Sequence, residues 1–275
     1  MPNLSNVSLK TTDSPQYDKI QSFQGVILGI IATPGIIGNI FALVVTAKLL
    51  KSQKLTINVF VFGLCCCDLA GIITVCVPTW TCYIFRGWQG GDHLCNFQGF
   101  ATIMFTMGSG MMATLMSIDR VVSIKAPVFH LAKVNIRVTS RLVVAVLLIS
   151  ALFAIMPVLG FGSFVLNLTG TYCTINWFAQ RPSDKAFSYI FATFGILMIL
   201  AVVISNTTVV ILLFQKRRAR INLKGMRVTK AKQVSANERI EIQVTRMMIL
   251  ISILFLVCWT PFMVSTAFAK ISVYS

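Results

Sequence analysis

Charged residues are scarce in this sequence. Only 12% of its 275 residues are Asp, Glu, Lys or Arg, whereas soluble domains carry about 25%. The hydrophobic fraction is 56%, which leaves too little polar surface to enclose a core of this size in water. A soluble globular protein is therefore not expected, and lipid should be the solvent for much of the chain.

The sequence also lacks the patterns of catalytic and metal sites. Its two histidines, His93 and His130, lie far apart, and there is no Cys-x-x-Cys pair, so a zinc site is not expected. Gly-x-Ser-x-Gly, His-Glu-x-x-His and Walker glycine-loop motifs are all absent. We therefore expect neither an enzyme nor a metal or organic cofactor, apart from the sodium ion considered below.

Six long apolar segments are present. A transmembrane helix needs roughly 20 mostly apolar residues to cross about 30 Å of hydrocarbon, and each segment meets that length. The segments are 24–50, 55–83, 94–124, 141–161, 187–214 and 242–268. Strand-like alternation with regular turn signals, as a membrane barrel requires, is absent. We predict an all-α, polytopic transmembrane bundle over 24–269, with an N-terminal tail over 1–23 and a short outer segment over 270–275.

Basic residues gather on one side of the predicted bundle. Most of the 24 lysines and arginines lie in the connections after the first, third and fifth segments. Short loops rich in Lys and Arg stay in the cytosol, which predicts a multi-pass membrane protein with an extracellular N-terminus. The basic run over 216–220 directly follows an apolar segment, so we interpret it as a cytosolic anchor to anionic membrane lipid and not as a nucleic-acid patch.

Glycosylation motifs agree with this orientation. Asn3, Asn6 and Asn167 each begin an Asn-x-Ser/Thr acceptor sequence. All three lie in segments that the charge distribution places outside. We therefore expect them to be glycosylated.

Two cysteines differ from the others in their position. Cys95 and Cys173 lie on the predicted outer side, in an oxidising compartment, while most of the other cysteines lie within apolar segments, where thiols act as small hydrophobes. We predict a disulfide between Cys95 and Cys173, in preference to two free thiols. It would tie the long outer connection across the mouth of the bundle.

Asp68 is an ionisable residue deep in an apolar segment. Such residues are costly in the membrane and are usually functional. Either the carboxyl is neutral and satisfied by a neighbouring helix, or it forms a cation or water site inside the bundle. A transporter could use such a group too, but no internal repeat is visible.

The third segment carries functional groups at both ends. Cys95 and Arg120 are 25 residues apart, or about 37 Å of helix, so the predicted staple and the Asp119–Arg120 pair lie on opposite sides of the membrane. Glu241 opens the sixth segment on the same side as Arg120. An arginine that pairs either with Glu241 or with a partner protein is a two-state element.

Pro261 follows Trp259 closely, deep in the sixth segment. Proline removes a backbone hydrogen bond and kinks the helix. The cytosolic half of that helix would then act as a lever about a tryptophan that can touch a ligand.

These residues together resemble the rhodopsin-like family of G-protein-coupled receptors over nearly the whole chain. The matching positions are Gly38-Asn39, 64–68, Trp88, Cys95, Asp119-Arg120-Val121, Cys173 and Cys258-Trp259-Thr260-Pro261. The resemblance implies six helices of a seven-helix receptor fold. It further implies that Asn39 and Asp68 form a polar core that helps to bind sodium, that Arg120 contacts a heterotrimeric G protein, and that Glu241 locks the resting state.

Within the family, the sequence is most similar to prostanoid receptors, in particular those for prostaglandin E. The resemblance lies in Gly87-Trp88-Gln89-Gly90-Gly91 and in Gly170-Thr171-Tyr172-Cys173, followed by Ile175-Asn176-Trp177. It implies that Tyr83 and Thr171 hydrogen-bond the carboxylate of an acidic lipid and that Trp259 lies under its acyl chains. Taken by itself, Tyr83 could equally be an aromatic-belt anchor. Tyr172, Thr174 and Val121 depart from the family pattern.

No segment corresponding to a seventh helix follows the sixth. We interpret the sequence as an incomplete or truncated receptor sequence. The three explanations are an incomplete gene model, a natural short isoform and omission of the seventh helix from the sequence. The expected function is a receptor for a prostaglandin or a similar acidic lipid, coupled to a G protein. The alternatives are a non-signalling form that associates with full-length receptor and, less favoured, a small-solute transporter.

Overall fold

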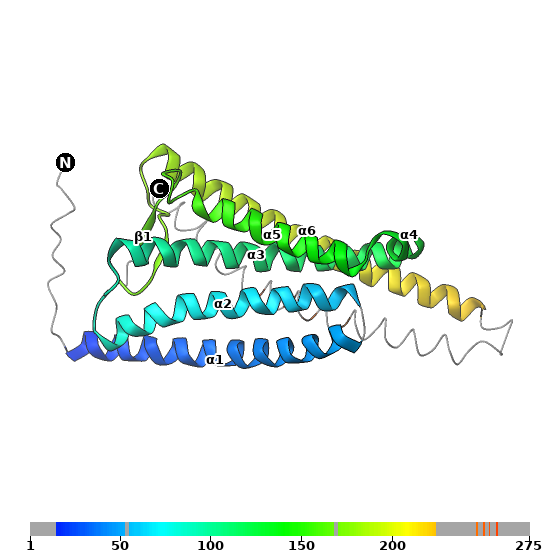
Figure 1. Ribbon diagram of the computed structural model, residues 1–275, viewed down its shortest axis with the longest axis horizontal. Helices are drawn as coiled ribbons and strands as arrows, with labels where there is room; N and C mark the ends of the chain where they lie inside the picture. The colour runs from blue at the N-terminus through cyan, green and yellow to red at the C-terminus, as the bar shows by residue number, and fades with distance from the viewer. Residues whose placement is uncertain are drawn as a thin grey trace.

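The computed structural model describes residues 15–52, 55–167 and 170–223, with residues 246, 250, 253 and 257 as isolated helical positions. The elements, in chain order, are α1 (Pro15–Ser52), α2 (Thr56–Ile84), α3 (Gly91–Lys125), α4 (Pro127–Lys133), α5 (Ile136–Ile155), β1 (Phe164–Leu166), β2 (Cys173–Ile175) and α6 (Pro182–Leu223). The helices form an elongated bundle with the strands at one end and α4 at the other (Figure 1).

Five of these helices are long and apolar enough to cross a membrane: α1, α2, α3, α5 and α6. They overlap the first five predicted segments, although α1 begins at Pro15 and α6 runs over Pro182–Leu223, beyond the predicted 24–50 and 187–214. This overlap confirms the all-α transmembrane bundle. The predicted sixth segment, with Glu241, Trp259 and Pro261, lies outside the described residues apart from the isolated helical positions.

The bounds predicted for the fourth span were wrong. We expected a helix over 141–161, but α5 runs from Ile136 to Ile155. Its start is set by Asn135, whose side chain accepts a hydrogen bond from the Val138 backbone N–H and caps the helix. Beyond its end, Gly160 has a φ of 96° and Gly162 a φ of 111°, a left-handed backbone that a helix cannot continue. The apolar character of 156–161 therefore belongs to a turn.

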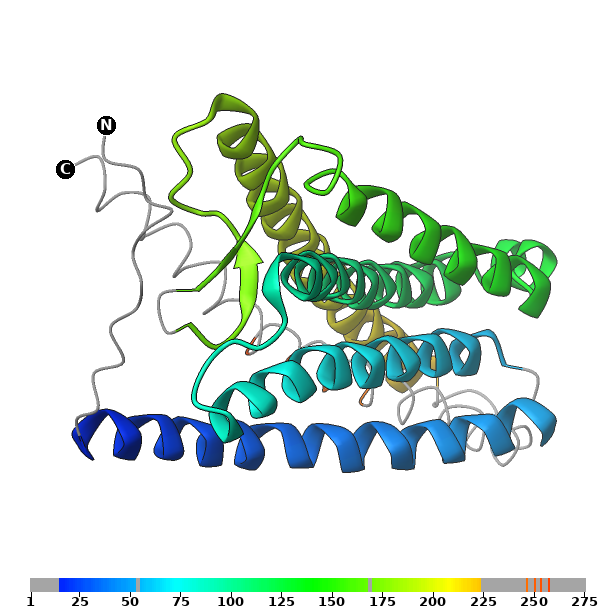
Figure 2. The ribbon, with the colours of Figure 1, turned by 60° about the vertical axis from the view of Figure 1, so that its left-hand side comes forward.

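The central helix of the described bundle is α3. It contacts α2, α5, α6, α4 and both strands, whereas α1 packs chiefly on α2. Figure 2 shows α3 foreshortened, between α2 and α5. Apolar groups fill the space between α3, α5 and α6. There the ring centroids of Phe187 and Phe191 on α6 lie 5.2 and 6.3 Å from the ring centroid of Phe153 on α5. Burial of this kind fixes the angles between helices, because a packed interior has few alternative arrangements.

A two-stranded hairpin closes one end of the bundle and was not expected from the sequence. β1 and β2 are antiparallel, with Phe164 opposite Ile175 and Leu166 opposite Cys173. The hairpin lies close to α3 because Gly99 has no side chain: a Cβ there would collide with the ring of Phe164. Three-residue strands carry too little periodicity to be recognised in an apolar sequence.

We expect Gly99→Ala to destabilise the protein by about 1–3 kcal/mol, because the added methyl group must push Phe164 and the hairpin away from α3. Thermal melting of the detergent-solubilised protein measures this. Gly29→Ala in α1 is the matched control: nothing lies within 4 Å of a Cβ at that site, so the change should be neutral or stabilising by up to about 1 kcal/mol. Equal melting temperatures for the two variants would contradict the close approach.

Candidate functional site

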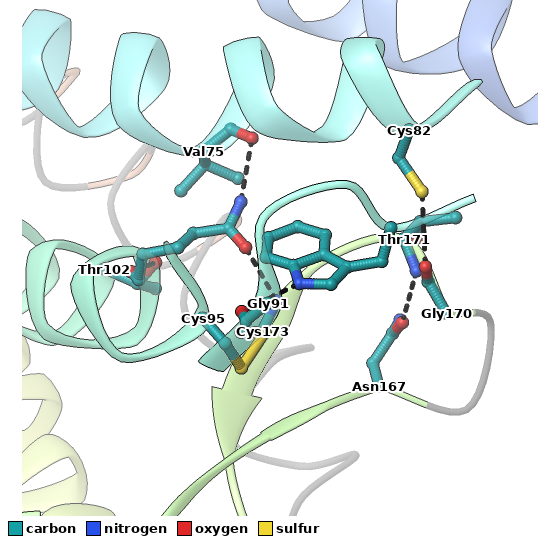
Figure 3. Close-up of a disulfide and its surroundings, with 11 residues drawn as sticks. Val75, Cys82, Gly91, Cys95, Thr102, Asn167, Gly170, Thr171 and Cys173 are labelled. Carbon is teal, nitrogen blue, oxygen red and sulfur yellow. Dashed lines mark hydrogen bonds between the residues drawn. A yellow bond between two sulfur atoms is a disulfide. The ribbon is translucent and has the colours of Figure 1, made fainter. Parts of the chain in front are cut away.

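The disulfide between Cys95 and Cys173 is present, as predicted. It joins the first turns of α3 to β2 across 78 residues of sequence, with a Cα–Cα separation of 5.2 Å (Figure 3). A covalent link over such a long loop removes conformational freedom from the unfolded chain. The hairpin is therefore fixed over one end of the bundle.

Gln98 reinforces this link with hydrogen bonds. Its side chain is fully buried. The amide Nε2 donates to the Val75 carbonyl of α2 at 3.2 Å, and Oε1 accepts from the Cys173 backbone N–H at 2.7 Å. One side chain thus joins α2, α3 and β2. Gln98 was not singled out from the sequence; the available signal was an amide side chain one turn after Cys95 in an apolar segment.

The tip of the hairpin is held by two further contacts. The side-chain oxygen of Asn167 accepts a hydrogen bond from the Thr171 backbone N–H at 3.1 Å, and the Cys82 thiol of α2 donates to the Gly170 carbonyl at 3.3 Å. Gly170 has a φ of 70°, which favours glycine at this turn. The predicted glycosylation site Asn167 is thus part of the turn, while Asn3 and Asn6 lie outside the described residues.

Two of the three predicted ligand residues lie at this end of the bundle. Thr171 is 2% exposed. Tyr83, on the last turn of α2, is partly buried with its ring against Gly25 of α1. The Cys82–Gly170 contact joins the immediate sequence neighbours of these two residues. The structure therefore brings the turns that carry Tyr83 and Thr171 together; Trp259 lies outside the described residues.

A small cavity of about 20 Å³ lies between α3, β2 and α6. Its lining includes Thr102, Thr106 and Thr174, whose side chains carry hydroxyl groups, together with the rings and methyl groups of neighbouring apolar residues. That volume accommodates about one water molecule. As it stands, this space is too small for a lipid.

Asp68 has a partner from the neighbouring helix. Its Oδ1 accepts a hydrogen bond of 2.6 Å from the Ser109 hydroxyl of α3. Asn39, which the family resemblance grouped with Asp68, donates instead to the Gly35 carbonyl of its own helix at 2.9 Å. Asp68 and Ser109 supply two oxygen atoms from facing helices, and oxygen is the donor that hard cations prefer. This donor set fits a cation at Asp68.

A cluster of ionisable groups occupies the other end of α3. Asp119 is 8% exposed. Its Oδ2 accepts a hydrogen bond of 2.7 Å from an Arg120 terminal nitrogen, and its Oδ1 lies 2.8 Å from Nε2 of His130 on α4. The Nε atom of Arg120 is buried without a hydrogen-bond partner among the described residues. Asp119 therefore holds both Arg120 and α4.

His130 was not expected to take part in this cluster. The available signal was an imidazole three residues after Pro127, in the connection that follows the Asp-Arg pair, but α4 itself was not predicted. Seven residues are too short for a clear helical period. The predicted partner Glu241 lies outside the described residues, so the ion pair that the structure shows for Arg120 is the one with Asp119.

Comparison with known protein families identifies the family of this chain. Residues 38–273 match the sequence profile of the family described as "7 transmembrane receptor (rhodopsin family)". The chain belongs to the rhodopsin family of seven-transmembrane receptors. It is therefore a multi-pass membrane receptor and not an enzyme.

The receptor is similar in sequence to a prostaglandin receptor and to a rhodopsin. It is 34% identical to the prostaglandin E2 receptor EP4 subtype of Bos taurus over 176 residues, which cover 64% of this chain and 36% of that protein. It is 26% identical to a GQ-coupled rhodopsin of Mizuhopecten yessoensis over 250 residues, covering 90% of this chain and 50% of that protein. The receptor sequence thus spans between about a third and a half of the length of these curated relatives.

The fold is also that of a solved rhodopsin. Squid rhodopsin superposes with a TM-score of 0.80 at 22% identity, over 90% of this chain and 72% of that one. At this identity the likeness shows the fold alone. In the receptor fold, α3 carries the hairpin at one end and the Asp119 cluster at the other.

We expect Gln98→Leu to destabilise the receptor by about 1–3 kcal/mol, because a leucine of similar size leaves the Cys173 N–H without its acceptor in a buried site. Thr102→Val is the matched control on the next turn: its hydroxyl donates only to the Gln98 carbonyl within the same helix, so its loss should cost less than about 1 kcal/mol. Thermal melting in detergent distinguishes the two. A Gln98→Leu protein as stable as its control would show that the bridge contributes little.

We expect His130→Phe to release α4 from α3, because phenylalanine keeps an aromatic ring but offers no nitrogen to Asp119. Loss of a hydrogen bond to a charged group costs about 1.5–3 kcal/mol, so amide exchange over 126–135 should rise about tenfold or more. His130→Gln places its amide nitrogen near the position of Nε2 and should retain slow exchange. His130→Asn, whose shorter side chain does not reach, should behave like Phe. Hydrogen–deuterium exchange with mass spectrometry is the measurement, and unchanged exchange in the Phe variant would contradict the contact.

Proposed function

We propose that the receptor binds a prostaglandin or a similar acidic lipid at the hairpin end and transmits binding to a heterotrimeric G protein at the Arg120 end. The observation that carries this proposal is α3: one uninterrupted helix, Gly91–Lys125, joins the disulfide-fixed hairpin to the Asp119–Arg120 pair. The similarity to prostaglandin E2 receptors supports the class of ligand.

The proposed orientation puts the hairpin end and the N-terminus outside, in the plasma membrane. A disulfide requires an oxidising compartment, which favours the outside for Cys95 and Cys173. At the opposite end, exposed basic side chains lie within the helices close to their ends, which is typical of the cytosolic side: Lys48, Lys51, Lys125, Lys133 and Arg137. Glycans on Asn3, Asn6 and Asn167 belong to the same proposal.

Tyr83 and Thr171 are the proposed hydrogen-bond donors to the ligand carboxylate. Both hydroxyl groups belong to turns joined by the Cys82–Gly170 contact. A carboxylate accepts such hydrogen bonds strongly where water is excluded. Because Thr171 is 2% exposed, the ligand must enter between α2 and the hairpin and displace the packing there. This step makes binding sensitive to the hairpin position.

Arg120 is the proposed contact for the G protein. In the structure its guanidinium is held by Asp119, so a partner must compete with that ion pair. Glu241 is the proposed second lock, and Trp259 with Pro261 the proposed lever in the sixth segment. A sodium ion held by Asp68 and Ser109, with Asn39 of α1 as a further member of the proposed polar core, would supply positive charge to the buried carboxylate and stabilise the arrangement of α2 against α3.

We expect Thr171→Val to weaken binding of radiolabelled prostaglandin E2 by roughly tenfold to a hundredfold, because one hydrogen bond to a charged group is worth about 1.5–3 kcal/mol. Tyr172→Phe is the matched control, since Tyr172 is adjacent and 40% exposed, and its affinity should be unchanged. Saturation binding on membranes from expressing cells measures both, with surface labelling to verify equal amounts of protein. Prostaglandin E2 with its carboxylate replaced by a neutral amide should bind the unsubstituted receptor and the Thr171→Val variant with the same low affinity.

Absence of saturable binding across a panel of prostaglandins, with the receptor at the cell surface, would overturn the ligand class. Binding that is equally tight for acid and amide would overturn the carboxylate contact but not the ligand class. The receptor family itself does not depend on either result.

A further inference from the structure

The short helix α4 exposes large apolar side chains at one end of the bundle. Val128 is 80% exposed, Phe129 56% and Leu131 83%. These three apolar residues belong to a helix of only seven residues. In water such a patch is unfavourable, and contiguous exposed apolar surface marks a site of contact with protein or membrane.

His130 fixes the direction in which this patch faces. Successive residues of a helix are turned by about 100°, so His130 lies about 160° from Val128 and about 100° from Leu131, on the side of α4 away from Val128. His130 points inward, with Nε2 at 2.8 Å from the buried Asp119 carboxylate. The inner face of α4 is thus anchored to α3, and its apolar face must point away from the bundle.

The start of α5 sets the depth of α4. α5 runs from Ile136 to Ile155 and is apolar enough to cross a membrane, and its first two turns carry Arg137 and Arg141, cations that favour the headgroups. α4 ends at Lys133, shortly before α5 begins, and lies at the end of the bundle opposite the hairpin (Figure 1). The apolar face of α4 is therefore level with the boundary between acyl chains and headgroups.

In the described part of the chain, the exposed charged residues that flank α4 are all positive. Lys125, Lys133, Arg137 and Arg141 flank it and are exposed, and the sequence has no acidic residue between Asp119 and Asp184. The acidic group nearest along the chain, Asp119, is buried and already paired with Arg120 and His130. An apolar face edged by cations is typical of helices that lie in the interface of an anionic membrane.

We infer that α4 lies in the plane of the bilayer interface at the Arg120 end of the receptor and binds anionic phospholipid, with Val128 and Leu131 among the acyl chains and the flanking cations on the headgroups. This inference requires neither the proposed ligand nor a G protein. A hydrophobic pocket on a G protein could also accept the patch, but the depth set by α5 and the surrounding cations favour lipid.

Lipid binding at the outer face of α4 also stabilises the contact at its inner face. The same helix carries Leu131 outward and His130 inward, so holding it at the interface holds His130 on Asp119. The lipid composition of the membrane is thereby coupled to the group that pairs with Arg120.

Photo-crosslinking tests the inference. The photoreactive residue benzoylphenylalanine replaces Val128 or Leu131, one at a time, in receptor reconstituted into nanodiscs of phosphatidylcholine with alkyne-tagged phosphatidylserine, or with tagged phosphatidylcholine instead. Leu148, 60% exposed on α5 and near the middle of that span, is the matched control position. We expect adducts with phosphatidylserine at 128 and 131 to exceed those with phosphatidylcholine at equal abundance, and no preference at 148.

The charge dependence is tested with a triple variant, Lys125→Gln, Lys133→Gln and Arg137→Gln. Each cation near an anionic surface is worth about fivefold in binding, so the preference for phosphatidylserine should fall at least tenfold. Neutralising Arg86, Arg181 and Lys185 at the hairpin end is the control and should leave it unchanged. In the unsubstituted receptor, amide exchange over 126–135 should be slower with phosphatidylserine than without it. In the triple variant, phosphatidylserine should leave this exchange unchanged.

Two results would overturn the inference. Positions 128 and 131 could give no lipid adduct while 148 does, or they could give an adduct only with added G protein, which would make the patch a protein surface. Equal adducts with both lipids, unaffected by the triple variant, would overturn the anionic specificity. Failure of prostaglandin binding, in contrast, would leave this test unaffected.

Discussion

Buried polar groups along α3 decide how the neighbouring elements are arranged, because each of them needs a partner where water is absent. Near one end, Gln98 bonds both α2 and β2. In the middle, Ser109 bonds Asp68 of α2. At the other end, Asp119 bonds His130 of α4. Apolar packing alone would let α3 rotate or slide, whereas these bonds are lost together if it does.

The two ends of α3 are constrained in different ways. At the hairpin end the constraint is covalent and the contacts around it are buried, so that end behaves as a rigid cover. At the other end the constraint consists of an ion pair and one contact to an imidazole, with Arg120 17% exposed. A competing partner can replace such contacts without breaking a bond or opening the core. This asymmetry suits a molecule that binds at one end and responds at the other.

The elements that were predicted correctly are those whose pattern can be recognised directly in the sequence. Spans of 20 or more apolar residues have few alternatives to a transmembrane helix, and a pair of outer cysteines has few alternatives to a disulfide. The hairpin and α4 were not predicted, since elements of three and seven residues are too short to show a period. The start of α5 was not predicted either. Asn135, which begins α5, is a common capping residue, but many asparagines in loops cap nothing.

Composition and residue order by themselves determined that this chain is a helical membrane protein, where five of its spans lie, which two cysteines pair, and the receptor family. They did so because lipid exposure and the cost of buried charge act on each segment separately. Only the tertiary structure decided that Gln98 bridges three elements, that Ser109 is the partner of Asp68, and that His130 shares the Asp119 carboxylate with Arg120. These contacts join residues on different elements, 11 to 75 positions apart, and depend on how the packed helices are rotated and how deep each one lies.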